Sequence, residues 1–248
     1  MKKIILAIAI FVLMTSRVFA LDLIVSAASG GTYHSFSSII AKHLKAKGIE
    51  VNLKIAGNCI LGKKLYNESD NAVMFNSEAD NAIPECHIPI TKENYFTNVF
   101  TAGWIIVSKD GTLGKRMGVV GYMKQTVKEL DVKLIPYKNT REIKAAFLAG
   151  EIDSGFVVQA ISDGLDADVI LDTMADDKGD FANWKNNNLT LNYYLITKGN
   201  IDDEVLQEIK NTPKFKSIAE SKKLIPINHS NIDTQIDYLK NNEEKWKK

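Results

Sequence analysis

An apolar run at Leu23–Ala27 passes through the glycine pair Gly30-Gly31 into a segment with helical spacing, Phe36–Lys47. A strand that enters a helix through such a turn points backbone N–H groups, and the positive end of the helix dipole, at whatever lies in front. The glycines also permit positive φ and close approach of a ligand. We therefore expect an anion-binding turn after the first strand.

Strand-like runs and helical patterns alternate along the rest of the chain, which predicts an α/β fold with mainly parallel sheets. The expected strands are Leu23–Ala27, Glu50–Ile55, Ala72–Asn76, Trp104–Ser108, Arg116–Val120, Lys133–Pro136, Ser154–Val158, Val169–Asp172 and Tyr193–Thr197. The expected helices are Phe36–Lys47, Leu61–Asn67, Met123–Leu130, Arg141–Ala149, Asp202–Asn211 and Lys214–Ser221.

The first twenty residues have the features of a secretory signal. Lys2 and Lys3 precede an apolar stretch that ends at Met14, and Val18-Phe19-Ala20 fits a signal peptidase site. The apolar stretch is too short to span a bilayer. We predict a signal peptide at 1–20 and a mature, soluble periplasmic chain that begins at Leu21.

Charge and cysteine content narrow the function further. Without Lys2, Lys3 and Arg17, the formal net charge of +1 becomes −2, which gives nucleic-acid binding no electrostatic support. The two cysteines, Cys59 and Cys86, lie far from the signal and cannot carry a lipid anchor there. In an oxidising compartment they are expected to form a disulfide.

The positions of the turns in the sequence indicate two lobes. The strand Trp104–Ser108 runs into the charged, glycine-containing turn KDGTLGKR, and a second series of strands and helices ends near Asn192–Leu195. We predict one domain from 21–107 plus about 196–248, and another from 108–195. A monomer with a ligand cleft between its lobes is expected, since small ligands bind in such clefts.

Three loops of the first lobe are candidate ligand sites because they follow strands, and α/β sheets bind ligands at the carboxyl ends of strands. Each loop alone is more often a structural turn, but together they indicate one rim. The candidates are Ser29, Gly30, Gly31, Thr32, Tyr33 and His34 in the first loop, Gly57, Asn58 and Cys59 in the second, and Asn76 and Ser77 in the third.

The second lobe adds Tyr137, Lys138, Asn139 and Asp153 as candidates. Lys138 could hold an acidic group, although a solvated lysine is the commoner outcome, and Asn139-x-x-Glu142 resembles a capping box. The mature chain has only two arginines, Arg116 and Arg141, and we expect Arg141 to point to solvent. Binding should then depend on helix starts and neutral donors, with help from Lys138 and His34.

The sequence offers little support for catalysis. It has no GxSxG, HExxH, P-loop or CxxC motif, and its four histidines lack metal-ligand spacing, so no metal or cofactor is expected. A thiol-dependent enzyme built on Cys59 with His34, or on Cys86 with His87, remains an alternative. It requires a free thiolate in an oxidising compartment.

Several stretches, taken in order over residues 22–227, resemble the periplasmic receptors of tripartite tricarboxylate transporters. They are the glycine-pair segment 23–45, the Gly57 loop at 51–65, the run Leu134–Lys138 (LIPYK), and the run Ala146–Asp153 (AFLAGEID). His34, Asn58–Ile60 and Asn139 depart from the family's usual residues.

The resemblance implies a two-lobed periplasmic binding fold that closes on a small carboxylate and passes it to membrane permease subunits. It also implies that backbone amides and bridging waters from Ser29–His34 and Gly57–Cys59 hold the ligand. The first loop is also similar to the GGTYY of TAXI-type TRAP receptors, a competing family. A receptor that presents its ligand to a membrane sensor would need the same fold.

Overall fold

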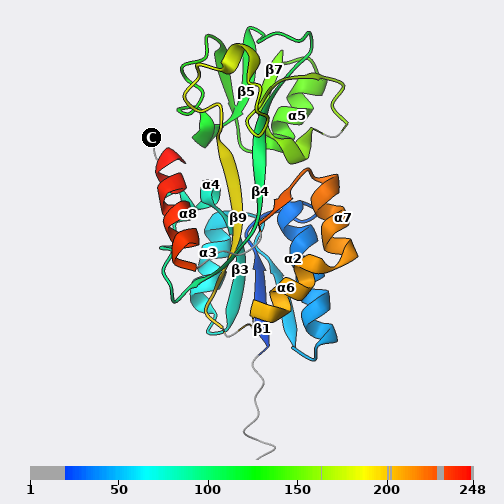
Figure 1. The fold of residues 1–248 in the computed structure, drawn as a ribbon, viewed down its shortest axis with the longest axis vertical. Helices are drawn as coiled ribbons and strands as arrows, with labels where there is room; N and C mark the ends of the chain where they lie inside the picture. Colours follow the sequence, from blue (N-terminus) through cyan, green and yellow to red (C-terminus); the bar gives the residue numbers. More distant parts are fainter. Residues whose placement is uncertain (1–19, 163, 200, 202, 228–231, 247–248) are drawn as a thin grey trace, which may run out of the picture.

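The computed structural model describes residues 20–162, 164–199, 201, 203–227 and 232–246. Apart from Ala20, the predicted signal peptide lies outside these residues. The chain forms two lobes, and the long strands β4 (Tyr95–Ser108) and β9 (Thr190–Thr197) run between them (Figure 1). None of the helices in the described ranges has the length and apolarity to cross a bilayer.

The first lobe is a sheet with helices on both faces. Its strands run in the order β2-β1-β3-β9-β4. Besides β4 and β9, the lobe contains β1 (Leu21–Val25), β2 (Val51–Ile55), β3 (Ala72–Ser77) and β10 (Ile225–Pro226), and β10 pairs with β4. One face carries α2 (Thr32–Ala46), α6 (Asp203–Asn211) and α7 (Pro213–Ser221); the other carries α3 (Cys59–Glu68), α4 (Glu78–Asn81) and α8 (Ile232–Trp246) (Figure 1).

Strand β3 shows why this lobe needs helices on both sides. All of its residues are buried, and successive side chains enter different cores. Phe75 packs with Phe36 of α2, whereas Met74 packs in the cluster that contains Tyr66 of α3. Because strand side chains alternate between the faces of a sheet, an apolar strand of this kind must be covered twice.

The second lobe surrounds the far part of β4. It contains β5 (Arg116–Val120), β6 (Lys133–Tyr137), β7 (Ser154–Val158), β8 (Asp168–Asp172), α5 (Thr140–Leu148) and three short 3-10 turns, Gly121–Met123, Gln159–Ile161 and Gly179–Phe181. Its core includes Trp104 stacked on Phe156 at a centroid distance of 4.9 Å. Trp184 meets Phe156 edge-on.

The lobes join within β4, whose partners change along its length. Residues up to Gly103 pair with β9, and residues from Trp104 pair with β7, with β8 joining from Ile105. Strand β9 pairs with β3 and with the part of β4 that belongs to the first lobe. The chain therefore changes lobes near residues 103 and 190, a few residues before the expected boundaries at 107 and 195.

Several expected elements differ from the structure. The sheet is mixed rather than mainly parallel, because every pairing of β4 and β9 is antiparallel. The expected helix Met123–Leu130 is a series of tight turns. Met123 and Val127, spaced i, i+4, are both buried in the core, and one i, i+4 backbone bond joins Val127 to Met123. The bonds from Thr126 to Met123 and from Leu130 to Val127 are of i, i+3 type, so no regular helix continues.

Candidate functional site

A cleft of about 780 Å³ lies between the lobes, and loops from both lobes form its walls. Strands β1, β2 and β3 of the first lobe and β5, β6 and β7 of the second all direct their carboxyl ends towards it. The lining residues are Ser26, Ala27, Ala28, Gly30, Gly31, Thr32, Tyr33, Gly57, Asn58, Cys59, Asp80, Ile83, Tyr122, Lys138, Asn139, Thr140, Arg141, Lys144, Val158, Ala160, Ile161, Tyr193 and Lys222.

Helix α2 begins at this cleft without a side-chain cap. Its N-cap residue is Gly31, and no side chain accepts from the first amides of the helix. Four other helices have the usual side-chain cap, from Asn58, Ser77, Asn139 and Thr212. The N–H groups at the start of α2 therefore remain available to an anion, which the helix dipole also favours.

Arg141 approaches this helix start from the opposite lobe. A Cβ built on Gly31 would lie 3.2 Å from Nη2 of Arg141. No ion pair or hydrogen bond joins the Arg141 guanidinium to another described residue. Arg141 is exposed, but its side chain lines the cleft, so the expectation that it points to solvent rather than into the cleft is wrong: Asn139 caps α5 at the end of β6, and this places the first turn of α5 on the cleft wall.

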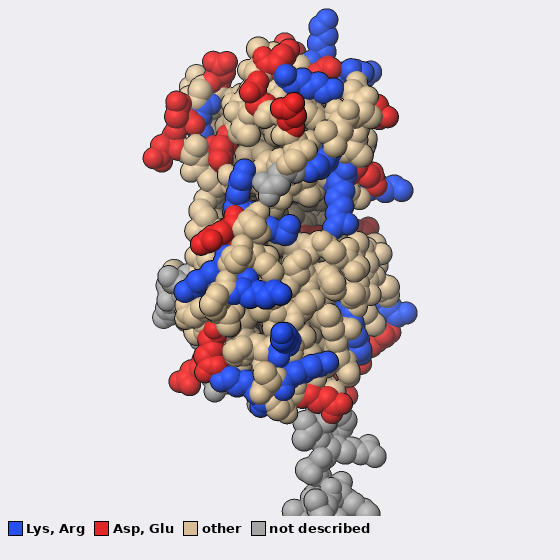
Figure 2. Space-filling view, turned by 90° about the vertical axis from the view of Figure 1, so that its right-hand side faces the viewer, with Lys and Arg blue, Asp and Glu red and all other residues tan. Residues whose placement is uncertain are grey.

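Positive charge dominates the cleft. Its lining includes four cationic side chains, Lys138, Arg141, Lys144 and Lys222, and a single acidic one, Asp80. Lys and Arg side chains lie on both sides of the hollow between the lobes (Figure 2). A cleft lined mainly by one sign of charge concentrates ligands of the opposite sign.

Asp80 is held by residues of the first lobe. The Tyr33 hydroxyl donates to Oδ2 of Asp80 at 2.6 Å, and the Asp80 N–H donates to the Ser77 hydroxyl at 3.2 Å. Burial raises the pKa of Asp80, although hydrogen bonds from Tyr33 and Ser77 oppose the shift. Burial also raises the phenol pKa of Tyr33, Tyr122 and Tyr193, and the charge of Asp80 raises each further. These phenols stay protonated and can donate hydrogen bonds.

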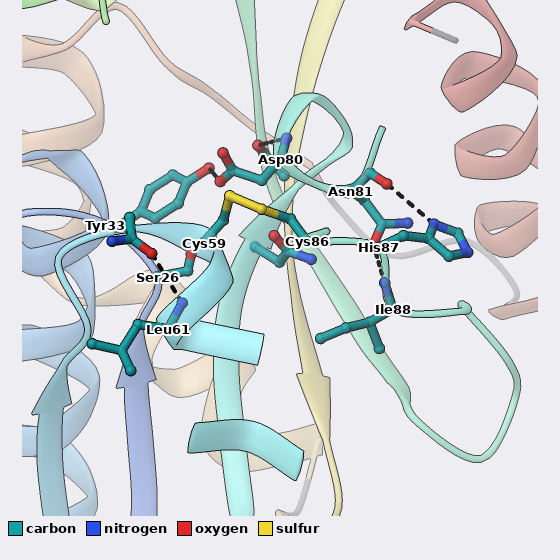
Figure 3. Close-up of a disulfide and its surroundings, with 12 residues drawn as sticks. Ser26, Tyr33, Cys59, Leu61, Asp80, Asn81, Cys86, His87 and Ile88 are labelled. Carbon is teal, nitrogen blue, oxygen red and sulfur yellow. Dashed lines mark hydrogen bonds between the residues drawn. A yellow bond between two sulfur atoms is a disulfide. The ribbon is translucent and has the colours of Figure 1, made fainter. Parts of the chain in front are cut away.

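The second loop is fixed by a cap and a disulfide. Gly57 has a φ of 82°, and Oδ1 of Asn58 accepts from the Leu61 N–H at 2.9 Å. The expected disulfide joins Cys59 to Cys86, beside the Tyr33–Asp80 pair (Figure 3). It ties the start of α3 to the segment after α4, where Oδ1 of Asn81 accepts from the Ile88 N–H.

Nine of the fifteen sequence-predicted ligand residues line the cleft: Gly30, Gly31, Thr32, Tyr33, Gly57, Asn58, Cys59, Lys138 and Asn139. Ser29 is exposed in the first loop outside the lining, and Tyr137, the last residue of β6, is also outside the lining. His34 is turned back on its own loop, where its Nδ1 accepts from the Gly30 N–H at 3.1 Å. That bond requires an unprotonated Nδ1.

Three of the predicted residues have other roles in the structure. Asp153 pairs with Arg116 at 3.0 Å, at the start of β7, while the cleft lies at the other end of that strand. It is therefore not a cleft residue. Asn76 and Ser77 are buried: Asn76 donates to the Tyr194 hydroxyl, and Ser77 caps α4.

Sequence reasoning missed cleft residues from several segments of the chain. Tyr122 and Ala160 follow β5 and β7, and the strand-end rule used for the other loops could have found them. Lys222 follows α7 and Tyr193 lies within β9, so no local pattern indicated them. Asp80 is the one acidic residue of the lining, and it stands three residues beyond the predicted Ser77 and two beyond the buried Glu78.

Comparison with known proteins gives matches among solved structures only: no family model and no curated protein matches the chain. The periplasmic binding protein BugD has a TM-score of 0.66 at 13% identity, with 92% of this chain and 95% of BugD covered. MatC from Rhodopseudomonas palustris with bound malate has a TM-score of 0.68 at 9% identity, covering 92% and 97%. A second R. palustris protein, with adipate, has a TM-score of 0.68 at 11% identity, covering 92% and 94%. The chain has the two-lobed α/β fold of periplasmic binding proteins.

Proposed function

We propose that this chain, which has the fold of BugD and MatC, is a periplasmic solute receptor of the tripartite tricarboxylate transporter type. It captures a small organic carboxylate between its lobes and delivers it to membrane permease subunits. One observation carries the proposal: the uncapped start of α2 faces the unpaired Arg141 across a cleft rich in cationic side chains.

The arrangement can bind a carboxylate through both lobes at once. Amides at the start of α2 donate from the first lobe, while Arg141 and Lys138 supply positive charge from the second. Charge-assisted hydrogen bonds of this kind are stronger than neutral ones. A ligand that contacts both walls binds best when the lobes are close, and it shifts the population towards that form.

The known proteins support this ligand class. Two structures with the same fold contain malate and adipate, both small dicarboxylates. A solute-binding protein from Polaromonas described as TctC shares the fold at a TM-score of 0.60 and 13% identity, covering 92% of this chain and 96% of that one. This supports the tricarboxylate branch over the TAXI branch.

The alternative of a thiol-dependent enzyme lacks a free thiol as its nucleophile. It depended on a free thiol at Cys59 or Cys86, and both residues are in the disulfide. Among the described residues, no group of three or more His, Cys, Asp or Glu side chains is placed to hold a metal ion. A binding role therefore agrees better with the site than a catalytic one.

A thermal-shift screen of the mature protein tests the proposal, with mono-, di- and tricarboxylates, amino acids and sugars as probes. At 100 times Kd a ligand stabilises the folded state by about 2.7 kcal/mol, which raises Tm by roughly 5–11 °C for a chain of this size. We expect shifts with carboxylates and none with Arg141→Gln. Shifts with sugars alone would overturn the proposal.

A further inference from the structure

Asp80 is unusual within the proposed site because it is an acid on the wall of an anion-binding cleft. Four cationic side chains share that lining, yet none of them forms an ion pair with Asp80. Its side-chain partners in the first lobe are both neutral: the Tyr33 hydroxyl lies 2.6 Å from Oδ2, and the Ser77 hydroxyl also hydrogen-bonds to the carboxyl. In Figure 3, one carboxylate oxygen turns to the Tyr33 hydroxyl and the other turns away from it.

Closure of the lobes would remove water from this carboxylate. A buried charge without an opposite charge beside it is costly, and the Tyr33 and Ser77 hydroxyls that bond to Asp80 are neutral. A second carboxylate placed here would add repulsion between like charges. The group that compensates Asp80 in the closed state should therefore bring a positive charge and several N–H donors.

The aromatic surroundings of Asp80 favour the same group. Tyr33 and Tyr193 of the first lobe meet edge-on at 5.5 Å, and Tyr122 of the second lobe lines the same cleft. The negative charge of Asp80 influences all three phenols. The faces of aromatic rings attract cations, and phenol oxygens can accept hydrogen bonds from an ammonium group.

The separation of the two subsites fits a small molecule. Tyr33 is the second residue of α2, and its hydroxyl reaches Asp80, so one tyrosine side chain spans the distance from the helix start to the acid. We infer that Asp80, together with Tyr33, Tyr122 and Tyr193, is a subsite for a primary ammonium group, and that the ligand is an amino carboxylate with its carboxylate at the start of α2. This inference depends on the proposed function.

Calorimetry with matched ligands tests it on the mature protein. The pairs are succinate with L-aspartate, glutarate with L-glutamate, and butyrate with 4-aminobutyrate, with L-malate as the hydroxyl analogue of L-aspartate. We expect the aminated member of at least one pair to bind at least tenfold more tightly than its partner. Asp80→Asn should remove that preference, because the ammonium group loses its opposite charge, and it should bind the amine-free dicarboxylates at least as tightly as the wild type, because a like charge is gone.

The outcomes separate the inference from the proposed function. If carboxylates bind but amination increases the affinity in no pair, the ammonium subsite is wrong and the receptor proposal stands. The same holds if L-aspartate binds more tightly than succinate but L-malate binds as tightly as L-aspartate. If no carboxylate binds at millimolar concentration, both are overturned. Circular dichroism checks that Asp80→Asn folds. If it does not fold, the affinities of the wild type for the ligand pairs still test the ammonium subsite. Tyr122→Phe is the second variant, and we expect it to lose a smaller part of the preference for the aminated ligand.

Discussion

The guanidinium of Arg141 faces Gly31 across the cleft, with Nη2 3.2 Å from the position that a Cβ on Gly31 would occupy. Gly31 has a φ of −83°, which any residue can adopt, so its lack of a side chain is not required by the backbone. A side chain at position 31 would instead crowd the Arg141 guanidinium at the start of α2, where we propose that the anion binds. Binding and folding can therefore be separated experimentally at this position.

Gly31→Val should fold normally and bind ligand more than tenfold more weakly, because the added side chain fills the space between the start of α2 and Arg141. Isothermal titration calorimetry measures the affinity, and thermal unfolding measures stability. Gly30→Ala is the matched control. Gly30 has a φ of 78° with open space around it, so alanine there should lower stability by about 1–2 kcal/mol and change affinity less. Unchanged affinity in folded Gly31→Val would contradict the proposed site.

Arg141→Lys should weaken carboxylate binding more than tenfold, since lysine cannot reproduce the planar, bidentate guanidinium. Arg116→Lys provides the control, because Arg116 pairs with Asp153 away from the cleft. Its affinity should match that of the wild type. Equal losses in the two variants would show that the effect is not local to the cleft.

Replacing both cysteines by serine should lower stability by about 3 kcal/mol in the chain-entropy model, because the disulfide closes a long loop. It should also weaken binding, since Cys59 lies on the cleft wall beside Asn58. Thiol titration of the denatured, unreduced wild type should find no free thiol. Two free thiols would reject the disulfide.

Asp80→Asn should raise Tm at neutral pH in the absence of ligand. The pKa of Asp80 is raised in the folded state, so this carboxyl contributes less stability as pH rises from its unfolded pKa through the folded one. Asparagine does not titrate and can still accept from Tyr33. The Tm difference between variant and wild type should therefore grow from pH 3 to pH 7. A constant difference would argue against a strained carboxylate.

Ser162→Ala should reduce ligand affinity about two- to tenfold, the effect of one hydrogen bond. Lys223, after α7, donates to the Ser162 hydroxyl at 3.0 Å, which joins the two lobes. Its loss should favour separation of the lobes. Ser221→Ala is the control, because that hydroxyl bonds to Ile218 within its own helix. Small-angle scattering of the ligand-free variants tests the cause, and an unchanged radius of gyration in Ser162→Ala would exclude it.

Local sequence determined much of this protein. The order of strands and helices, the glycine turn before α2, the Asn58 and Asn139 caps and the charged turn after β4 all depend on neighbouring residues, whose preferences act over a few positions. The disulfide followed from the number of cysteines and the expected compartment. Nine cleft residues were found because loops after parallel strands meet at one edge.

Only the tertiary structure decided what the two lobes place opposite each other. Arg141 is near Gly31 because the two lobes meet there, although 110 positions separate them in the chain. The change of partners at Gly103 in β4, and the meeting of Tyr122 with Asp80 and Tyr193, likewise depend on contacts between distant segments. Such contacts form through burial and packing over the whole fold, and no local spacing encodes them.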